Sequence, residues 1–205
     1  MTSLASARDR LLAAARELFP RHGYEAVSVR ALTARAKVNL GAVTYHFGSK
    51  TALFHAAIES IAEPFADTVA SAAATPGTEL DRVEAVVRAV LRHLAGQPAA
   101  PRMLLRELAN DRPLPPPMAR LMKRNVGVLV GLITAGQEEG TIRTGDPLLL
   151  ALSVVAQPFY VILAGPIIQQ ALAIDRSDPR IRARLVDHVA QSVRRTIANH
   201  PEAEP

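Results

Sequence analysis

Apolar residues recur along most of the chain at intervals of three and four positions, the spacing that places them on one face of an α-helix. The first such face comprises Leu11, Leu12, Ala15, Leu18 and Phe19. Strict alternation of apolar and polar positions, which would predict β-strands, is nearly absent. The pattern therefore predicts an all-α protein.

Polar side chains suited to capping the N-terminus of a helix lie at four places in the first fifty residues, namely Ser6, Ser28, Asn39 and Ser49. Ser6 is followed three positions later by Asp9, which makes a capping box. We expect helices from each cap: one ending near Gly23, one over 29–36, one over 40–46 and one from residue 50 onward. Three helices and the start of a fourth therefore occupy the N-terminal quarter of the chain.

Longer helices are predicted beyond this point. Their expected ranges are 50–74, 78–95, 102–109, 118–139, 148–173 and 180–198. A turn over 96–101 and a proline-rich connector over 112–117 separate some of them. Because proline removes a helical hydrogen bond, we expect Pro64, Pro158 and Pro166 to bend or break the helices that contain them.

The order of these elements predicts two domains in the 205 residues. A small helical domain over residues 1–50 precedes a larger helical domain over 51–200, and the helix that starts at residue 50 connects them. Residues 201–205 are expected to form a disordered tail.

The longest apolar stretch, Leu148–Ile168, is interrupted by polar residues and prolines, so no membrane-spanning helix is predicted. The N-terminus lacks the continuous apolar segment of a secretory signal. We therefore expect a cytoplasmic protein with no membrane partner.

The sequence contains no recognisable motif for catalysis or metal binding. It contains no cysteine, and no two of its six histidines stand three or four positions apart, which leaves no thiolate chemistry and no metal-ligand spacing. Glycine-rich phosphate loops and nucleophile elbows are also missing. We expect no enzymatic activity, no catalytic residues, no metal and no cofactor.

The positive charge is concentrated near the N-terminus. Residues 1–50 contain eight Lys or Arg and three Asp or Glu, whereas the rest of the chain contains sixteen of each sign, so the first quarter carries the whole net charge of +5. A localised excess of cations is typical of a domain that faces a polyanion such as DNA.

The predicted helices 29–36 and 40–46 are joined by about three residues, which is the plan of a helix-turn-helix. Apolar residues would hold the two helices together, and these are Val29, Leu32, Ala36, Val38, Val43 and Phe47. Other tight helical corners share this pattern, so it is of moderate specificity by itself.

The segment Asn39–Lys50, with its Tyr-His-Phe run and the following Leu53 and Phe54, resembles the recognition helix and the start of the next helix in the TetR family. Upstream residues stand in the family's order and spacing, namely Phe19, Gly23, Tyr24 and Ser28. The resemblance covers residues 8–55. It implies a homodimeric transcriptional regulator, most commonly a repressor, that binds double-stranded operator DNA.

One position departs from the family pattern, since Lys37 stands in the turn where glycine is common. If that position requires a left-handed backbone, a residue other than glycine costs about 1 kcal/mol there. Lys37 would also place a cation near the DNA backbone.

Residue types divide the expected DNA contacts into two groups. Small or methyl-bearing side chains suit base reading in the major groove, and these are Leu40, Gly41, Ala42 and Thr44. Hydroxyl, imidazole and ammonium groups at helix ends suit phosphates, and these are Ser28, Tyr45, His46 and Lys50. Arg30 and Lys37 add nonspecific attraction, and Asn39 opens the recognition helix.

Structural roles are the alternatives for several of these residues. Tyr45 and Phe47 could be core aromatics, and for Phe47 this is the preferred interpretation. His46 could be structural, and Gly41 and Ala42 could be small because helices pack there.

A single recognition helix reads few base pairs, so such domains are normally paired on two half-sites. The resemblance implies a four-helix dimer interface built from the last two helices of each subunit. The apolar residues proposed for it are Leu152, Val155, Phe159, Leu185, Val189 and Val193. Filling the core of one subunit is the alternative for each.

The resemblance also implies an effector cavity in the larger domain. Its expected walls are His93, Met103, Leu104, Arg106, Met118, Met122 and Phe159. Methionines adapt to irregular apolar ligands, and Arg106 or His93 could pair with a polar group. We therefore expect a small, largely apolar effector, with core filling as the alternative for the methionines.

Two other functions fit the same fold. A helical ligand-binding or scaffold protein without specific DNA binding would need no charged first domain. An activator would differ from a repressor only in where its operator lies.

Overall fold

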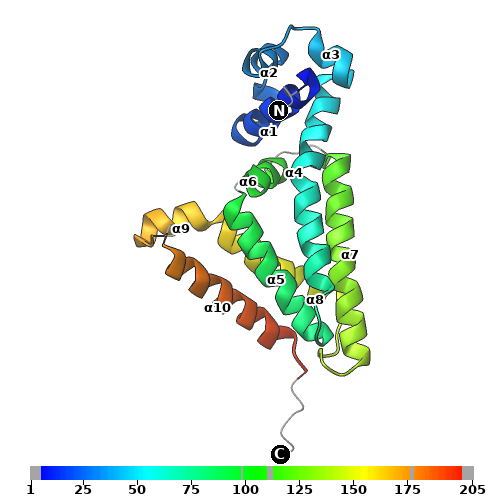
Figure 1. Ribbon diagram of the computed structural model, residues 1–205. Helices are drawn as coiled ribbons and strands as arrows, with labels where there is room; N and C mark the ends of the chain where they lie inside the picture. Colours follow the sequence, from blue (N-terminus) through cyan, green and yellow to red (C-terminus); the bar gives the residue numbers. More distant parts are fainter. Residues whose placement is uncertain (1–5, 98, 110–112, 176–177, 200–205) are drawn as a thin grey trace, which may run out of the picture. The chain divides into compact units, whose positions relative to one another are not determined.

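The computed structural model describes residues 6–97, 99–109, 113–175 and 178–199. Within these ranges the regular elements are α-helices, apart from one isolated antiparallel bridge between Ile142 and Ala198 (Figure 1). The helices are α1 (Ala7–Ala26), α2 (Val29–Ala36), α3 (Ala42–Phe47), α4 (Lys50–Ala73), α5 (Glu79–Gly96), α6 (Ala99–Leu108), α7 (Pro116–Glu138), α8 (Pro147–Leu163), α9 (Gly165–Leu172) and α10 (Pro179–Ile197). The predicted all-α fold is confirmed.

The chain forms two compact units. The first comprises Met1–Pro64 and Gln97–Leu121, and the second comprises Phe65–Gly96 and Met122–Pro205. The first unit therefore contains α6 as well as α1, α2 and α3, because α6 packs against α1. It is larger than the domain of residues 1–50 expected from the sequence. The tail predicted over 201–205 lies outside the described residues.

Helix α1 is capped at its start and interrupted near its end. The Ser6 hydroxyl accepts a hydrogen bond from the Asp9 amide at 3.1 Å, and the Asp9 carboxylate accepts one from the Ser6 amide at 3.3 Å. The hydroxyl of Ser6 also keeps the pKa of Asp9 below its ordinary value. Gly23 has φ 80° and ψ 167°, outside the helical region. The helix is thus broken where its end was predicted and resumes as far as Ala26.

Helix α2 covers the predicted residues, and the Ser28 hydroxyl caps it by accepting a hydrogen bond from the Ala31 amide at 3.1 Å. Helix α3 begins at Ala42 and not at residue 40, and its N-cap is Gly41, which has no side chain to cap with. The prediction that Asn39 caps this helix is wrong. The Asn39 carbonyl instead accepts a hydrogen bond from the Ala42 amide at 3.1 Å, in a turn that precedes the helix.

Prolines affect the later helices unequally. Pro64 and Pro158 lie inside α4 and α8 without ending them. The chain breaks at Ala164 instead, and Pro166 occupies the first turn of α9, where proline needs no helical hydrogen bond. The single helix predicted over 148–173 is therefore two helices, bent by 54°. Within the described residues no single helix has the length and apolar content of a membrane span, although the bent pair reaches both when taken together.

Helices α6 and α7 begin earlier than predicted. α6 starts at Ala99 and takes Pro101 into its first turns, and α7 starts at Pro116 inside the expected connector. Proline is tolerated in the first turn of a helix, so these residues do not form the loops that their composition suggested.

Each unit has an apolar core of its own. In the first, Leu11, Leu32 and Leu53 are fully buried, and Met103 of α6 and Met118 of α7 belong to the same cluster. In the second, α5 packs against α8 and α10.

Ion pairs join α5 to α10 in the second unit. A terminal nitrogen of Arg194 lies 2.7 Å from the Asp81 carboxylate and 3.0 Å from that of Glu84. Arg88 pairs with Glu84 at 2.9 Å and also with Asp187. The two helices are therefore held by polar contacts along their edge as well as by apolar packing.

Candidate nucleic-acid interface

Helices α2 and α3 lie next to α1 (Figure 1). They pack against α1 and against each other through apolar side chains. Leu32, Ala36 and Val43 are at most 3% exposed. Val29, Val38 and Phe47 are partly buried against the same cluster. The predicted helix-turn-helix is confirmed, and its packing leaves the outer faces of both helices uncovered.

The outer face at α3 carries most of the predicted base-reading residues. Thr44 and Gly41 are exposed, and Leu40 is 54% exposed in the turn before the helix. Ala42 is only 8% exposed and belongs to the core cluster. The prediction that Ala42 reads bases is therefore wrong, because it lies on the inner side of the first turn.

Tyr45 is 85% exposed, so it is not a core aromatic. Its ring meets the ring of His46 edge-on, with centroids 4.8 Å apart, and His46 is partly buried. Phe47 packs against the core, as preferred for it, and the guanidinium of Arg8 lies 5.2 Å from its ring centroid. The three consecutive aromatic residues thus differ in role, with Tyr45 the most available to a ligand.

Helix α2 presents polar groups at both of its ends. Ser28, Arg30, Lys37 and Asn39 are all exposed. Lys37 has φ 53° and ψ 52°, the left-handed conformation, and its amide donates to the Ala34 carbonyl at 3.2 Å. Lys37 in place of glycine therefore costs about 1 kcal/mol of backbone strain. It also adds an exposed positive charge at the turn.

Lys50, the first residue of α4, lies over an aromatic ring. Its Nζ is 4.3 Å from the ring centroid of Tyr24, and the Tyr24 hydroxyl lies 2.6 Å from Oγ1 of Thr51. Ser49 caps α4 by accepting from the Ala52 amide at 3.0 Å. The cation is thus held at a helix N-terminus, where phosphate groups bind readily.

Sequence reasoning missed two arginines that brace the helix-turn-helix. Arg10 donates from Nε to the Ala36 carbonyl at 3.1 Å, and Arg35 pairs with Glu17 of α1 at 2.5 Å. From the sequence alone, both arginines were recognised only as part of the positive charge of residues 1–50. Their partners are on another helix, so no local pattern could reveal the contacts.

Four residues predicted for the effector cavity have partners within the first unit. Met103, Leu104 and Met118 pack in its apolar cluster. Arg106 donates from Nε to the Pro20 carbonyl at 3.1 Å and from a terminal nitrogen to the Arg21 carbonyl. Packing and hydrogen bonding inside this unit account for all four without a ligand.

The other three belong to the second unit. His93 lies with Nδ1 3.0 Å from the Thr68 hydroxyl and its ring edge-on to Phe65, and burial lowers its pKa. Phe159 is partly buried and Met122 is 44% exposed. The effector cavity therefore stays a prediction.

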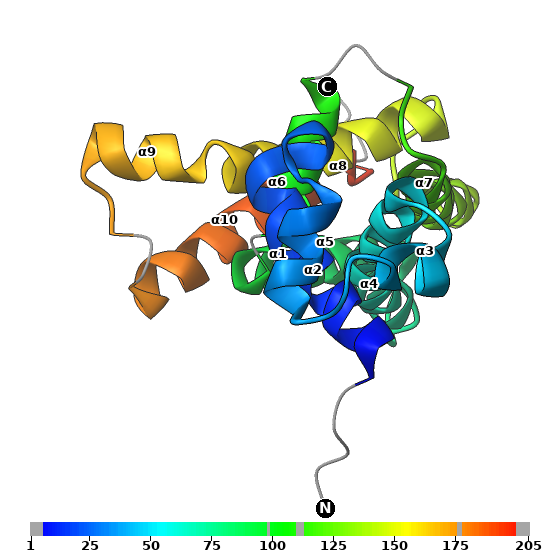
Figure 2. The ribbon, with the colours of Figure 1, turned by 90° about the horizontal axis from the view of Figure 1, so that it is seen from above.

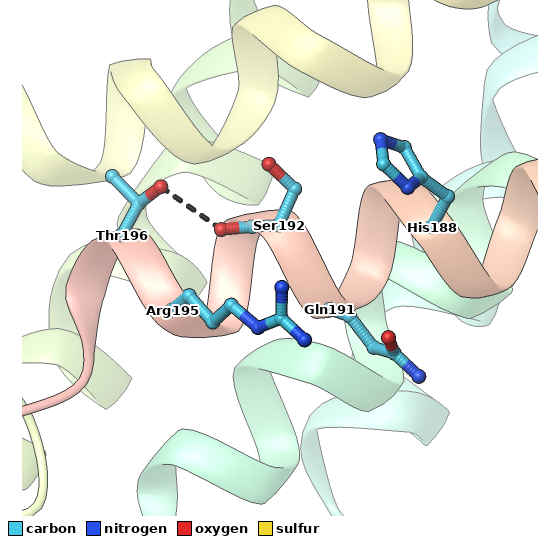
Figure 3. Close-up of a pocket in the computed structure, with 5 residues that line it drawn as sticks. All are labelled: His188, Gln191, Ser192, Arg195 and Thr196. Carbon is cyan, nitrogen blue, oxygen red and sulfur yellow. Dashed lines mark hydrogen bonds between the residues drawn. The ribbon is translucent and has the colours of Figure 1, made fainter.

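Two surface hollows lie along α10 of the second unit. One, of about 280 Å³, is lined by His188, Gln191, Ser192, Arg195 and Thr196 (Figure 3). The other, of about 410 Å³, lies where the end of α5 meets the start of α10, and is lined by Arg92, Ala95, Gly96, Arg182, Ala183, Val186 and Asp187. Neither contains a residue predicted for the effector cavity.

The predicted dimer residues divide between core and surface. Val189 and Val193 are 4% and 1% exposed, on the helix that packs against α5. The prediction that they form a dimer interface is wrong, because they fill the core of their own subunit. Val155, Phe159 and Leu185 are partly buried, and Leu152 is 47% exposed.

Many of the exposed large apolar side chains among the described residues are on α8 and α9, and the sequence pattern predicted few of them. Those on α8 and α9, between 47% and 71% exposed, are Leu148, Leu149, Leu152, Tyr160, Ile167 and Leu172. Figure 2 shows α9 and the start of α10 extending away from α5. We call this set the α8–α9 apolar face.

Comparison with known proteins assigns the family. The family described as "Bacterial regulatory proteins, tetR family" matches residues 11–57, and the "Tetracyclin repressor-like, C-terminal domain" matches residues 80–193. The chain belongs to the TetR family. It is a transcriptional regulator, and the match to the family's helix-turn-helix DNA-binding domain lies within its first unit.

Three relatives illustrate the similarity of this TetR-family regulator. The HTH-type transcriptional repressor AcnR of Corynebacterium efficiens is 39% identical over 64 residues, 31% of this chain and 34% of that protein, so the match spans about a third of that relative. A regulatory protein of the tetR family from Rhodococcus RHA1 is 25% identical, with a TM-score of 0.71 over 93% of this chain and 98% of that one. The regulator FadR of Bacillus subtilis, solved in complex with stearoyl-CoA, is 18% identical, with a TM-score of 0.75 over 90% of this chain and 96% of that one, which shows a shared fold.

Proposed function

We propose that this regulator is a homodimeric repressor that binds a palindromic operator through α3 and releases it when a small, largely apolar effector binds. The observation that carries the proposal is the outer face of α3. Tyr45 is 85% exposed there, beside exposed Thr44. The exposed Tyr45 hydroxyl can meet a phosphate oxygen, and the neighbouring Thr44 can meet a base edge.

Side-chain chemistry divides the contacts on this face. Leu40, Gly41 and Thr44 are small or carry methyl groups, which suits approach to base edges and thymine methyls in the major groove. Ser28 and Lys50 stand at the N-termini of α2 and α4, where exposed amides and the helix dipole favour a phosphate. The net charge of +5 in residues 1–50 supplies attraction that does not depend on sequence.

The dimer is proposed to form through the α8–α9 apolar face. Large apolar side chains such as Leu152, Tyr160 and Ile167 are 47%, 67% and 71% exposed on it. A concentration of exposed large apolar side chains on two neighbouring helices favours an interaction site. A second copy of the chain would bury it on both subunits and would place two recognition helices on two half-sites.

An apolar effector is proposed to bind in the larger domain. The structural relative FadR of Bacillus subtilis was solved with stearoyl-CoA, which has a long acyl chain. DNA and effector would favour different arrangements of the same dimer, so each would weaken binding of the other by the same factor. A coupling of about 2–3 kcal/mol, roughly 30- to 150-fold, is enough for a switch. Because its target is the operator, we propose that the regulator acts in the cytoplasm.

The test is a selection of random DNA duplexes by the purified full-length protein, carried out at two salt concentrations. Wild type is compared with Tyr45→Ala and Lys50→Ala. Lys123→Ala is the matched control, because Lys123 is an exposed lysine of α7 in the second unit. We expect wild type and the control to enrich one palindromic motif. We expect Tyr45→Ala and Lys50→Ala to bind it more weakly. Only Lys50→Ala, which removes a charge, is expected to lower the salt slope, by about one.

Enrichment of no motif, with binding that is only salt-sensitive, would overturn the proposal in favour of a ligand-binding or scaffold protein without specific DNA binding. Enrichment of a motif that Tyr45→Ala and Lys50→Ala bind as tightly as wild type would place the DNA contacts elsewhere.

A further inference from the structure

The guanidinium of Arg106 in α6 binds the end of the first part of α1. Its Nε donates to the Pro20 carbonyl at 3.1 Å, and a terminal nitrogen donates to the carbonyl of Arg21. The same group covers Gly23, since a Cβ at that residue would lie 3.6 Å from a terminal nitrogen of Arg106. One side chain of α6 thus contacts three points next to the break in α1.

The contact supplies hydrogen bonds to carbonyl groups that the broken helix leaves without amide partners. Carbonyl groups in the last turn before a helix break lose their usual amide partners, and the backbone at Gly23 leaves the helical region at φ 80° and ψ 167°. A cation also interacts favourably with the negative end of the helix dipole. Arg106 therefore serves as a C-cap for α1 supplied from a distant part of the chain.

The residue after the break connects this cap to the DNA-binding face. The Tyr24 ring stacks on Phe19, with centroids 6.2 Å apart, and meets Phe54 of α4 at 5.0 Å. Its hydroxyl lies 2.6 Å from Oγ1 of Thr51, and its face lies 4.3 Å from Nζ of Lys50. Tyr24 directly follows Gly23, so the direction of the chain at the break contributes to where the ring beneath Lys50 lies.

We propose that Arg106 is a positioning residue for DNA binding: by capping α1 at its break, it fixes Tyr24 beneath Lys50 and so holds the Lys50 ammonium where a phosphate is met. The proposal rests on the proposed function, in which Lys50 contacts the operator backbone. It replaces the effector contact that the sequence suggested for Arg106.

The first measurement needs no DNA. The Lys50 ε-methylene is bonded to Nζ, which lies over the Tyr24 ring at 4.3 Å from its centroid. The NMR signal of the ε-methylene protons in wild type is therefore expected to be shifted upfield by the ring current. Arg106→Ala is expected to lose most of this shift. Arg106→Lys keeps a cation that can reach one carbonyl, so we expect an intermediate shift. Arg102→Ala, which removes an exposed arginine from the same helix, is the control and is expected to leave the shift unchanged.

The second measurement is operator affinity in a double-mutant cycle. Arg106→Ala is expected to weaken specific binding about tenfold, the size of one charge-assisted contact, with little effect on binding to unrelated duplex. If Arg106 acts through Lys50, then Arg106→Ala adds little further loss in a Lys50→Ala background. If the two residues acted independently, the losses of affinity in the two single variants would multiply in the double variant. Arg106→Lys is expected to bind the operator more tightly than Arg106→Ala and more weakly than wild type.

The outcomes are distinguishable. A retained ring-current shift in folded Arg106→Ala, or multiplied losses in the double variant, would overturn the proposal. If Arg106→Ala does not fold, the same comparison is made with Arg106→Leu, which keeps side-chain bulk but cannot donate a hydrogen bond. A ring-current shift and an operator affinity equal to those of wild type in that variant would equally overturn the proposal. Failure of wild type to select any operator would refute the proposed function, whereas the NMR comparison would still decide whether Arg106 positions Lys50.

Discussion

Arg10 donates from Nε to the carbonyl oxygen of Ala36, the last residue of α2, at 3.1 Å. The next residue is Lys37, whose left-handed backbone turns the chain toward α3. The turn of the helix-turn-helix is therefore braced from α1 at the point where its own backbone is most strained.

Lys37→Gly is expected to stabilise the protein by about 0.5–1 kcal/mol, because glycine adopts this conformation without a Cβ clash, although it loses more entropy on folding. Urea unfolding measures the change. Lys37→Ala is the matched control, since it removes the same charge and keeps the Cβ. Equal stability of the two variants would show that the left-handed backbone carries no strain. Both variants are expected to bind the operator with a lower salt slope.

Gly23→Ala is expected to destabilise the protein by about 1–2 kcal/mol, because the residue has φ +80° and alanine rarely adopts a positive φ. Gly96→Ala is the control, because Gly96 lies at the end of α5, where a Cβ would meet open space. Thermal unfolding of both variants and of wild type measures the two changes in stability. A loss of stability as large in Gly96→Ala would contradict this account.

Leu152→Glu is expected to shift the protein from dimer to monomer without unfolding it, because Leu152 is 47% exposed on the α8–α9 apolar face. Val193→Ala is expected to lower the stability of the protein and to leave the dimer intact. It removes methyl groups from a site only 1% exposed, so about 2 kcal/mol of stability is lost while the dimer persists. Sedimentation velocity and urea unfolding together test this contrast. A Leu152→Glu protein that remains dimeric would place the interface elsewhere.

Acid is expected to weaken the contact between α5 and α10. The Thr78 hydroxyl, followed by Arg194, lowers the pKa of Asp81 to about 2. Because this value lies below the ordinary value of 3.8, the stabilisation is present above about pH 4 and is lost as the pH falls toward 2. Asp81→Asn is therefore expected to lower stability at pH 7, by about 1 kcal/mol for a lost helix-cap contact. Exposure of the side chain to solvent limits the effect.

The difference between Asp81→Asn and wild type is expected to shrink as the pH falls toward 2. The free energy of unfolding, measured against pH, tests this. Asp67→Asn, at an exposed aspartate of α4, is the control. A difference that stays constant between pH 7 and pH 2 would contradict the assignment.

Local signals predicted most of the fold. The Ser6 and Asp9 capping box, the Ser28 cap and the Ser49 cap all mark helix starts where the structure has them. These contacts join residues close in sequence, so a short pattern contains both partners. The helix-turn-helix was predictable for the same reason, since its core positions repeat at helical spacing within twenty residues.

Long-range packing explains the errors. Ala42 and Thr44 are both small, and only the position of α1 makes the first a core residue and leaves the second exposed. Val193 was assigned to a dimer interface because its apolar character fits a core as well as an interface, and only its burial against the same subunit separates these roles. The bonds of Arg106 to the end of α1 join residues 85 and 86 positions apart, beyond any local pattern.

The composition of the first unit from two separate stretches of chain has a practical consequence. Met103 and Met118 complete its core, and they follow the segment 65–96 that belongs to the second unit. The first unit is therefore complete only once the chain has been made through residue 121, after the intervening segment 65–96. A chimera that takes only the N-terminal segment into another regulator would leave behind α6 and with it part of the domain's interior.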